Sequence, residues 1–199
     1  MNERVMDIHK EDYFEDVEFS GLIKNNEDLR SKSFYKCNFN ACDFSGSDFS
    51  DALFSECRFQ SSNFSLAVFT NTKFQNVYFD SCKILGVDFT SINTLILQID
   101  FKNSLINDCN FSSLPLKETN LMHCQIINSD FYQSDLRGSN FSGSNLKDTI
   151  FEKTNLSEVD FTEAKDYSIN PFINKIKNAK FSMPEAIVLL KSLEIIIDD

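Results

Sequence analysis

A large apolar residue returns at every fifth position through the first half of this 199-residue chain. An amphipathic helix repeats every 3.6 residues and a strand every 2, so neither produces a period of five. The period instead predicts a solenoid, in which short repeats stack and bury one continuous core. The inward positions of this ladder are Phe34, Phe39, Phe44, Phe49, Phe54, Phe59, Phe64, Phe69, Phe74, Phe79, Ile84 and Phe89.

The ladder extends beyond this stretch in both directions. Towards the N-terminus it includes Phe14 and Phe19, falters at Lys24 and resumes at Leu29. After Phe89 the phase shifts by two residues, and we expect the insertion at 90–95 to form a bulge or a short outward loop. The later inward positions are then Ile96, Phe101, Ile106, Phe111, Leu116, Leu121, Ile126, Phe131, Leu136, Phe141, Leu146, Phe151, Leu156 and Phe161.

Two positions before each ladder residue the side chain is usually small, and all six cysteines occupy this column. Disulfides and a metal site are the alternatives to consider for six cysteines. No CxxC pair occurs, however, and a small buried position suits a reduced thiol that packs as a compact hydrophobe. We therefore expect free cysteines in the core. The phase after the insertion places Thr94 in the same column.

The repeating unit reads small–polar–Phe/Leu–polar–polar, as in Cys42-Asp43-Phe44-Ser45-Gly46 and Ser139-Asn140-Phe141-Ser142-Gly143. This pattern resembles the pentapeptide-repeat family over residues 14–163. The resemblance implies an all-β fold, a right-handed quadrilateral parallel β-helix with four pentapeptides in each coil. Residues 1–13 are then an N-terminal leader or cap, and residues 164–199 form a separate C-terminal segment.

The C-terminal segment has the pattern of a short helix. Ser182-Met-Pro-Glu185 matches a capping box with a proline near its start, and an apolar stripe follows from Ala186. We expect an α-helix that caps the last coil, and self-association through that cap is a second possible role. The residues assigned to capping or dimerisation are Ile187, Leu190, Leu193, Ile195 and Ile197.

The net charge of −11 argues against a nucleic-acid partner, which would require a basic surface to neutralise phosphates. The charge is compatible with a basic protein partner, or it serves only to keep the rod in solution. The N-terminus lacks the apolar core of a signal peptide, and no apolar run is long enough to span a membrane. Cytoplasm is the expected location.

No catalytic motif is present. The two histidines, His9 and His123, lie outside any known pattern, and we expect His123 on the outer surface. Neighbouring acids such as Asp48 and Asp51 suggest paired carboxylates or a calcium site, but calcium requires a clustered cage of oxygen ligands. We expect a protein without a cofactor or metal that is not an enzyme.

One outer face carries more acids than bases. Residues twenty apart share a face of a four-sided coil, provided that the insertion does not rotate the second half. The neighbouring face is mixed, with Lys73, Lys117 and Arg137. The alternative is a solvated face without a partner. The residues of this acidic stripe are Asp28, Asp48, Asp51, Asp88, Asp130 and Glu152.

The tail Ile169-Asn-Pro171 … Asn174-Lys-Ile … Phe181-Ser-Met-Pro-Glu-Ala186 resembles bacterial pentapeptide-repeat proteins that include a microcin immunity protein, which are similar to Qnr-type quinolone-resistance proteins. The resemblance implies a homodimer, joined through the C-terminal segments, whose acidic rod mimics DNA. Such a dimer would bind DNA gyrase or topoisomerase IV and relieve poisoning by a fluoroquinolone or a peptide toxin. The chain lacks the long loops of the Qnr pattern. A scaffolding repeat protein with a different partner is the alternative.

Overall fold

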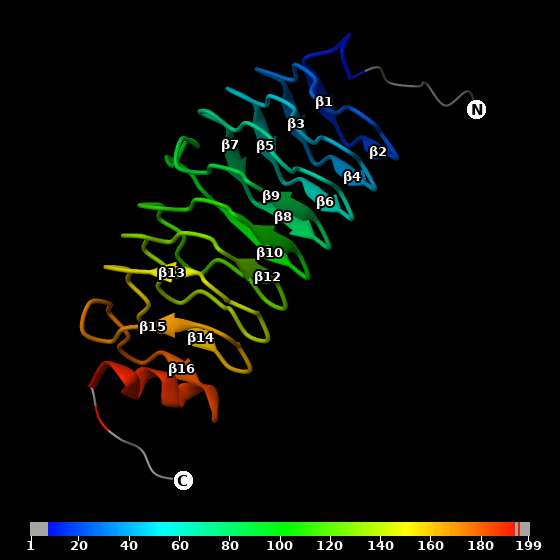
Figure 1. Ribbon diagram of the computed structural model, residues 1–199. Helices are drawn as coiled ribbons and strands as arrows, with labels where there is room; N and C mark the ends of the chain where they lie inside the picture. Colours follow the sequence, from blue (N-terminus) through cyan, green and yellow to red (C-terminus); the bar gives the residue numbers. More distant parts are fainter. Residues whose placement is uncertain (1–7, 194, 196–199) are drawn as a thin grey trace.

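The computed structural model describes residues 8–193 and 195 as a parallel β-solenoid of about eight turns. Figure 1 shows a rod whose first strands, β1 and β2, and last strand, β16, lie at opposite ends, with a short helix beyond β16. The predicted all-β repeat fold is confirmed. None of the helices in this part of the chain is long and apolar enough to cross a membrane.

The strands are short and form parallel ladders along the rod. One sheet has the order β1-β3-β5-β7, a second β10-β8-β6-β4-β2 and a third β12-β11-β9, while β13 pairs with β15 and β14 with β16. The bounds are β1 Tyr13–Glu15, β2 Glu18–Ser20, β3 Ser33–Tyr35, β4 Asn38–Asn40, β5 Leu53–Ser55, β6 Arg58–Gln60, β7 Lys73–Gln75, β8 Val77–Asp80, β9 Lys83–Leu85, β10 Ile99–Lys102, β11 Leu105–Asn107, β12 Gln125–Ile127, β13 Ile150–Phe151, β14 Asp160–Phe161, β15 Ser168–Ile169 and β16 Lys180–Phe181.

A sharp turn after each inward residue produces the period of five. The residue two positions further on takes left-handed backbone, as at Asn71 (φ 54°) and Ser81 (φ 56°). Left-handed backbone is costly for β-branched residues, and no Val, Ile or Thr occurs at these positive-φ positions in the described chain. Gly143 is also needed for space, because a Cβ there would overlap the imidazole of His123 in the preceding coil.

Consecutive coils are joined by backbone hydrogen bonds in both directions. The Phe64 N–H donates to the Lys83 carbonyl of the following coil at 2.7 Å, and the Lys83 N–H donates to the Ser62 carbonyl at 2.9 Å. The coil at Lys24 keeps this register, since Lys24 N–H donates to the Asp43 carbonyl at 2.7 Å. The polar residue therefore replaces an inward side chain without adding a loop.

Stacked phenylalanines fill the N-terminal half of the core. Rings one coil apart lie nearly parallel, as for Phe34 and Phe54 at 5.0 Å and 6°, while rings of neighbouring faces meet edge to face, as for Phe34 and Phe39 at 5.3 Å and 75°. Both arrangements are favourable for the aromatic quadrupole. All inward residues assigned from the sequence are buried except Ile96.

The column of small residues, two positions before each inward residue, lies beside the core. Its side chains contact carbonyls of the preceding coil. All six cysteines are free and buried, as predicted. The Cys57 thiol lies 3.3 Å from the Phe34 carbonyl, and in the C-terminal half the Ser134 hydroxyl donates to the Phe111 carbonyl at 2.7 Å. Lys32 also occupies this column and is buried; its Nζ donates to the Glu11 carbonyl at 2.8 Å.

The two-residue insertion lies slightly later than expected. Asn93 still pairs with Lys73 in the original register, and Ile99 pairs with Val77 in the new one. The assignment of Ile96 to the core is wrong, because this side chain is 55% exposed and the neighbouring Leu95 is 87% exposed. Thr94 is also exposed, whereas Ile92 occupies a buried position. The extra residues bulge outward, which leaves the inward period intact on either side.

The C-terminal end departs from the sequence prediction in three details. The helix η1 spans Glu185–Leu193 and has 3₁₀ rather than α geometry. Ser182 does not form the expected capping box, because its hydroxyl accepts the N–H of Glu163 at 2.9 Å. Parallel pairing also continues past residue 163, as far as the pairing of Phe181 with Phe161.

Candidate functional site: an acidic face

Four residues of the predicted acidic stripe, Asp28, Asp48, Asp88 and Asp130, lie in one column along the rod. Asp28 pairs with Asp48, and further along Asp88 pairs with Asn110, which in turn pairs with Asp130. The column passes the insertion without changing face, because the extra residues lie on another side of the coil. Val68 and Ile150 occupy the same column and are 42% and 45% exposed. From Asp48 onward, acids therefore alternate with amide or apolar side chains.

Each aspartate of the column uses one carboxylate oxygen to close its own turn. Asp48 Oδ1 accepts the Ser50 N–H at 2.8 Å and the Ser50 hydroxyl at 2.5 Å. Asp88 Oδ1 accepts the Thr90 N–H at 2.9 Å and the hydroxyl of the same residue at 2.7 Å. Such Asx turns satisfy a backbone donor that the coil leaves unpaired. The second oxygen of Asp88 accepts no hydrogen bond from any described residue.

The N-terminal end of the column is partly neutralised. Arg30 donates to both carboxylate oxygens of Asp28, at 2.8 and 2.6 Å, and its Nε lies 3.9 Å from Asp48 Oδ2. This hydrogen bonding lowers the pKa of Asp28 to about 2. The negative field of the stripe is therefore carried mainly by the residues beyond Arg30.

Asp51 and Glu152 lie beside the column rather than in it. Asp51 occupies a left-handed corner (φ 62°), where its Oδ1 accepts a hydrogen bond from the Asn71 side chain at 2.7 Å. Glu152 is exposed, and the adjacent Lys153 places its ammonium 5.3 Å from the centre of the Tyr132 ring. The charge of Glu152 is thus offset by a cation, whereas Asp51 extends the acidic surface.

Sequence reasoning did not identify the turn-closing role of these aspartates. The signal was available, because Asn and Asp also precede inward residues on the other faces. Asn63 accepts the Ser65 N–H at 3.1 Å, and Asn140 accepts the Ser142 N–H at 2.9 Å. An amide closes the turn as well as a carboxylate does. The choice of Asp over Asn is therefore the part that the turn does not explain.

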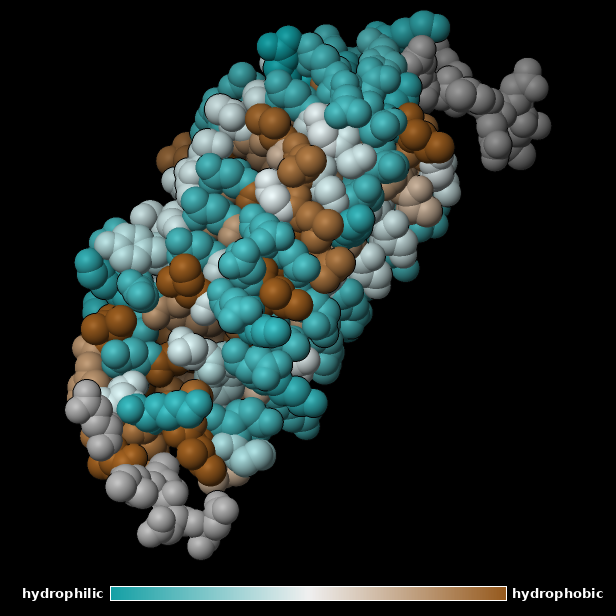
Figure 2. Space-filling model, in the orientation of Figure 1, coloured by the Kyte–Doolittle hydropathy of each residue, from teal (hydrophilic) through white to brown (hydrophobic). Residues whose placement is uncertain are grey.

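The described C-terminal residues that we assigned to capping or dimerisation are exposed, and two other apolar residues cover the core. Val188 and Leu189 pack against the core, whereas Ile187, Leu190, Leu193 and Ile195 are 38–54% exposed. Ile197 lies outside the described residues. Figure 2 shows apolar side chains gathered on this end of the rod. One side of η1 therefore covers the core, and the four described residues of the predicted set remain exposed.

Comparison with known proteins gives the family. The model of the pentapeptide repeat region matches residues 32–111 and 93–161, which together are more than half of the chain. No curated protein sequence matches the chain. Among solved structures, a trypsin-treated variant of QnrB1, a plasmid-mediated fluoroquinolone resistance protein, superposes with a TM-score of 0.72 at 20% identity, covering 92% of this chain and 99% of that one.

A second trypsin-treated variant of QnrB1 superposes with a TM-score of 0.63 at 20% identity, covering 94% of this chain and 100% of the other. At this identity the likeness establishes the fold alone. The family match over two overlapping stretches, the five-residue inward ladder and the four-sided parallel coils all agree. The chain belongs to the pentapeptide-repeat family.

Proposed function

We propose that this protein is a non-enzymatic acidic rod that mimics DNA and occupies the basic DNA-binding surface of DNA gyrase or topoisomerase IV. The observation that supports the proposal is the column of Asp48, Asp88 and Asp130, which stays on one face across the insertion. With coils about 4.8 Å apart, these carboxylates recur at roughly 10 Å intervals on a rigid support. The likeness to QnrB1 supplies the fold on which such a surface is displayed.

Binding of this kind is electrostatic, so it weakens as salt is raised. The consequence for the cell is protection from a topoisomerase poison, a fluoroquinolone or a peptide toxin. The short bulge at 94–98 offers less surface than a long loop would, so we expect binding to be the primary activity and rescue of a poisoned enzyme to depend on it.

The test is a charge-neutralising variant that preserves every turn. Changing Asp48, Asp88 and Asp130 to Asn keeps the acceptor of each Asx turn and removes three charges from the column. The matched control changes Asp43, Asp135 and Asp160, which close equivalent turns elsewhere. In a gyrase supercoiling assay with and without a fluoroquinolone, we expect the stripe variant to lose inhibition or protection and the control to retain most of it.

A scaffolding role with a different partner is the second candidate. It is favoured by the turn-closing bonds of the aspartates and by the apolar Val68 and Ile150 within the column. Equal behaviour of the two triple variants, or no effect of the wild-type protein on either topoisomerase at micromolar concentration, would support this role over DNA mimicry.

We also propose a homodimer joined through the exposed apolar surface of η1. The supporting observation is that Ile187, Leu190 and Leu193 point away from the core that Val188 and Leu189 cover. Leu190→Asp is expected to yield a monomer of unchanged melting temperature, as measured by light scattering and thermal unfolding. Val188→Ala, the control, should lower the melting temperature and leave the dimer. A wild-type protein that is monomeric at all concentrations contradicts the proposal.

A further inference from the structure

The insertion leaves an unpaired seam between two neighbouring coils. In most coils the residue before an inward position donates its N–H to the preceding coil, as Asp135 does to the Leu114 carbonyl at 3.0 Å. Pro115 stands at the corresponding position of its coil and has no N–H. No backbone hydrogen bond among the described residues joins 90–98 to 112–119.

At the next face a side chain replaces a backbone acceptor. The Asn140 N–H donates to the Thr119 carbonyl at 3.0 Å, but the equivalent N–H of Asn120 donates instead to Asp100 Oδ1 at 2.7 Å. The carbonyls of Ile92 and Ile99 consequently receive no backbone hydrogen bond from the following coil. Backbone acceptors without partners are unusual in a β-ladder, where nearly every group is paired.

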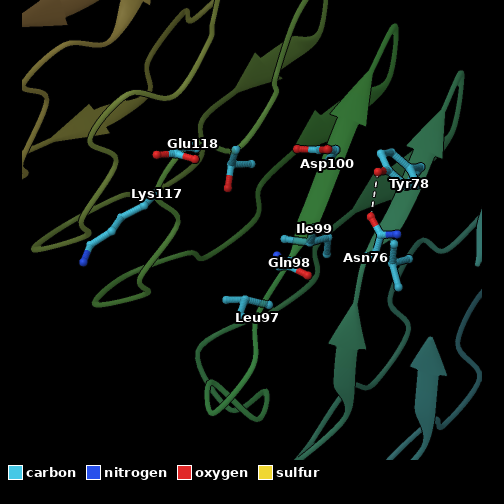
Figure 3. Close-up of a pocket in the computed structure, with 10 residues that line it drawn as sticks. Asn76, Tyr78, Leu97, Gln98, Ile99, Asp100, Lys117 and Glu118 are labelled. Carbon is cyan, nitrogen blue, oxygen red and sulfur yellow. Dashed lines mark hydrogen bonds between the residues drawn. The ribbon is translucent and has the colours of Figure 1, made fainter. Parts of the chain in front are cut away.

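A cavity of about 230 Å³ opens at this seam. Figure 3 shows Asp100 and Gln98 on one side of it, Glu118 on the other, and Asn76 hydrogen-bonded to Tyr78 at its margin, at 2.6 Å. The volume lies below the roughly 300–1,000 Å³ of pockets for drug-sized molecules. A single side chain or a small ion fits it better than a metabolite does.

The cavity is rich in acceptors and carries uncompensated negative charge. Neither Asp100 nor Glu118 forms an ion pair with a described residue. The one cation of the lining, Lys117, extends away in Figure 3, and its Nζ lies 3.6 Å from Asp135 Oδ2 instead. Burial raises the pKa of Asp100, the change expected of a carboxylate without a cationic partner.

We propose that this cavity binds a guanidinium group, presented by an arginine side chain of a partner protein or by a small free guanidinium compound. A guanidinium has N–H donors in a planar fork and no acceptor. These donors match two carboxylates together with Ile99, a lining residue whose carbonyl receives no backbone hydrogen bond from the following coil. An ammonium directs fewer donors and is more strongly hydrated. The described residues contain no cluster suited to a metal ion.

The test follows amide signals by NMR while three probes are added to the full-length protein: ethylguanidinium, a capped Gly-Arg-Gly peptide and a capped Gly-citrulline-Gly peptide. Asp100→Asn keeps the acceptor for the Asn120 N–H and removes the charge. Asp108→Asn is the matched control, because Asp108 likewise accepts a bond from an asparagine, Asn128, but does not line the cavity.

We expect saturable shifts at residues 98–100 and 117–119 with both guanidinium probes and none with citrulline. Asp100→Asn should weaken binding about tenfold, as loss of a charged hydrogen-bond partner does, while Asp108→Asn leaves it unchanged. Tighter binding of the peptide than of ethylguanidinium indicates an arginine of a partner, and the reverse indicates a free ligand. Absence of saturable shifts, or equal losses in the two variants, overturns the proposal. The assay contains no topoisomerase, so its outcome does not depend on whether the proposed function is correct.

Discussion

The coils before the insertion and those after it share one inward period but fill their cores differently. Before it, rings of neighbouring faces pack against one another, as Phe64 does against Phe59 at 4.9 Å and 81°. After it, Phe131 and Phe141, which are two faces apart, meet at 5.8 Å and 85°. The remaining two faces there carry Leu or Ile, such as Leu136.

The difference has a simple steric cause. Four phenylalanines in one coil occupy the cross-section completely, so each ring contacts those beside it. When two faces carry the shorter Leu or Ile, the phenylalanines of the other two reach across the axis. The coil therefore accepts more than one core composition at similar volume, as other protein cores do. What it requires is an inward apolar residue at each fifth position and a turn that permits it.

The largest expected effect is the loss of stability when a core residue is truncated, and it can be compared between the two halves of the rod. Phe64→Ala should lower the free energy of unfolding by about 3–5 kcal/mol, and Leu136→Ala should cost less because a smaller cavity remains. Leu66→Ala is the control, since this side chain is 67% exposed and its loss should change stability by less than about 0.5 kcal/mol. Urea unfolding measures all three. An unchanged stability in Phe64→Ala would contradict the buried ladder.

A smaller loss of stability is expected in the column of small residues, where it distinguishes hydroxyls from thiols. Ser134→Ala removes the hydrogen bond to the Phe111 carbonyl and should cost about 1 kcal/mol. Cys57→Ser should be better tolerated, because its hydroxyl can donate to the same Phe34 carbonyl that the thiol contacts. Thermal unfolding of the two variants under reducing conditions provides the comparison. A greater loss in Cys57→Ser would show that packing of the sulfur outweighs the hydrogen bond.

The smallest effect concerns two carboxylates on either side of the insertion. Arg30 lowers the pKa of Asp28, whereas burial raises that of Asp100. A lowered folded-state pKa contributes stability that is present above the unfolded value and is lost as pH falls towards 2. Arg30→Gln should therefore raise the Asp28 pKa in an NMR titration and leave Asp100 unchanged. A joint shift of both groups would indicate a long-range field instead.

Much of the fold was predictable because it depends on local repetition. A period of five places Phe44, Phe64 and their equivalents inward whatever their neighbours are, and the absence of β-branched residues at the corners of the described chain supports the same turn. Ile96 is misassigned because the shift in the repeat shows that two residues are inserted but not at which residue the chain bulges out of the coil. Backbone pairing decides that point, and it retains Asn93 in register.

The sequence by itself determined the repeat, the inward ladder and the buried reduced cysteines, since each follows from spacing and side-chain size. Only the tertiary structure decided which outer groups are already engaged. The aspartates of the stripe close turns, η1 divides its apolar residues between the core and solvent, and the seam at Pro115 leaves carbonyls unpaired. The packing of η1 and the seam depend on contacts between residues about twenty apart, and such contacts exist only once the coils have stacked. The aspartate turns are local, but only the folded coil shows which backbone donors remain for them to satisfy.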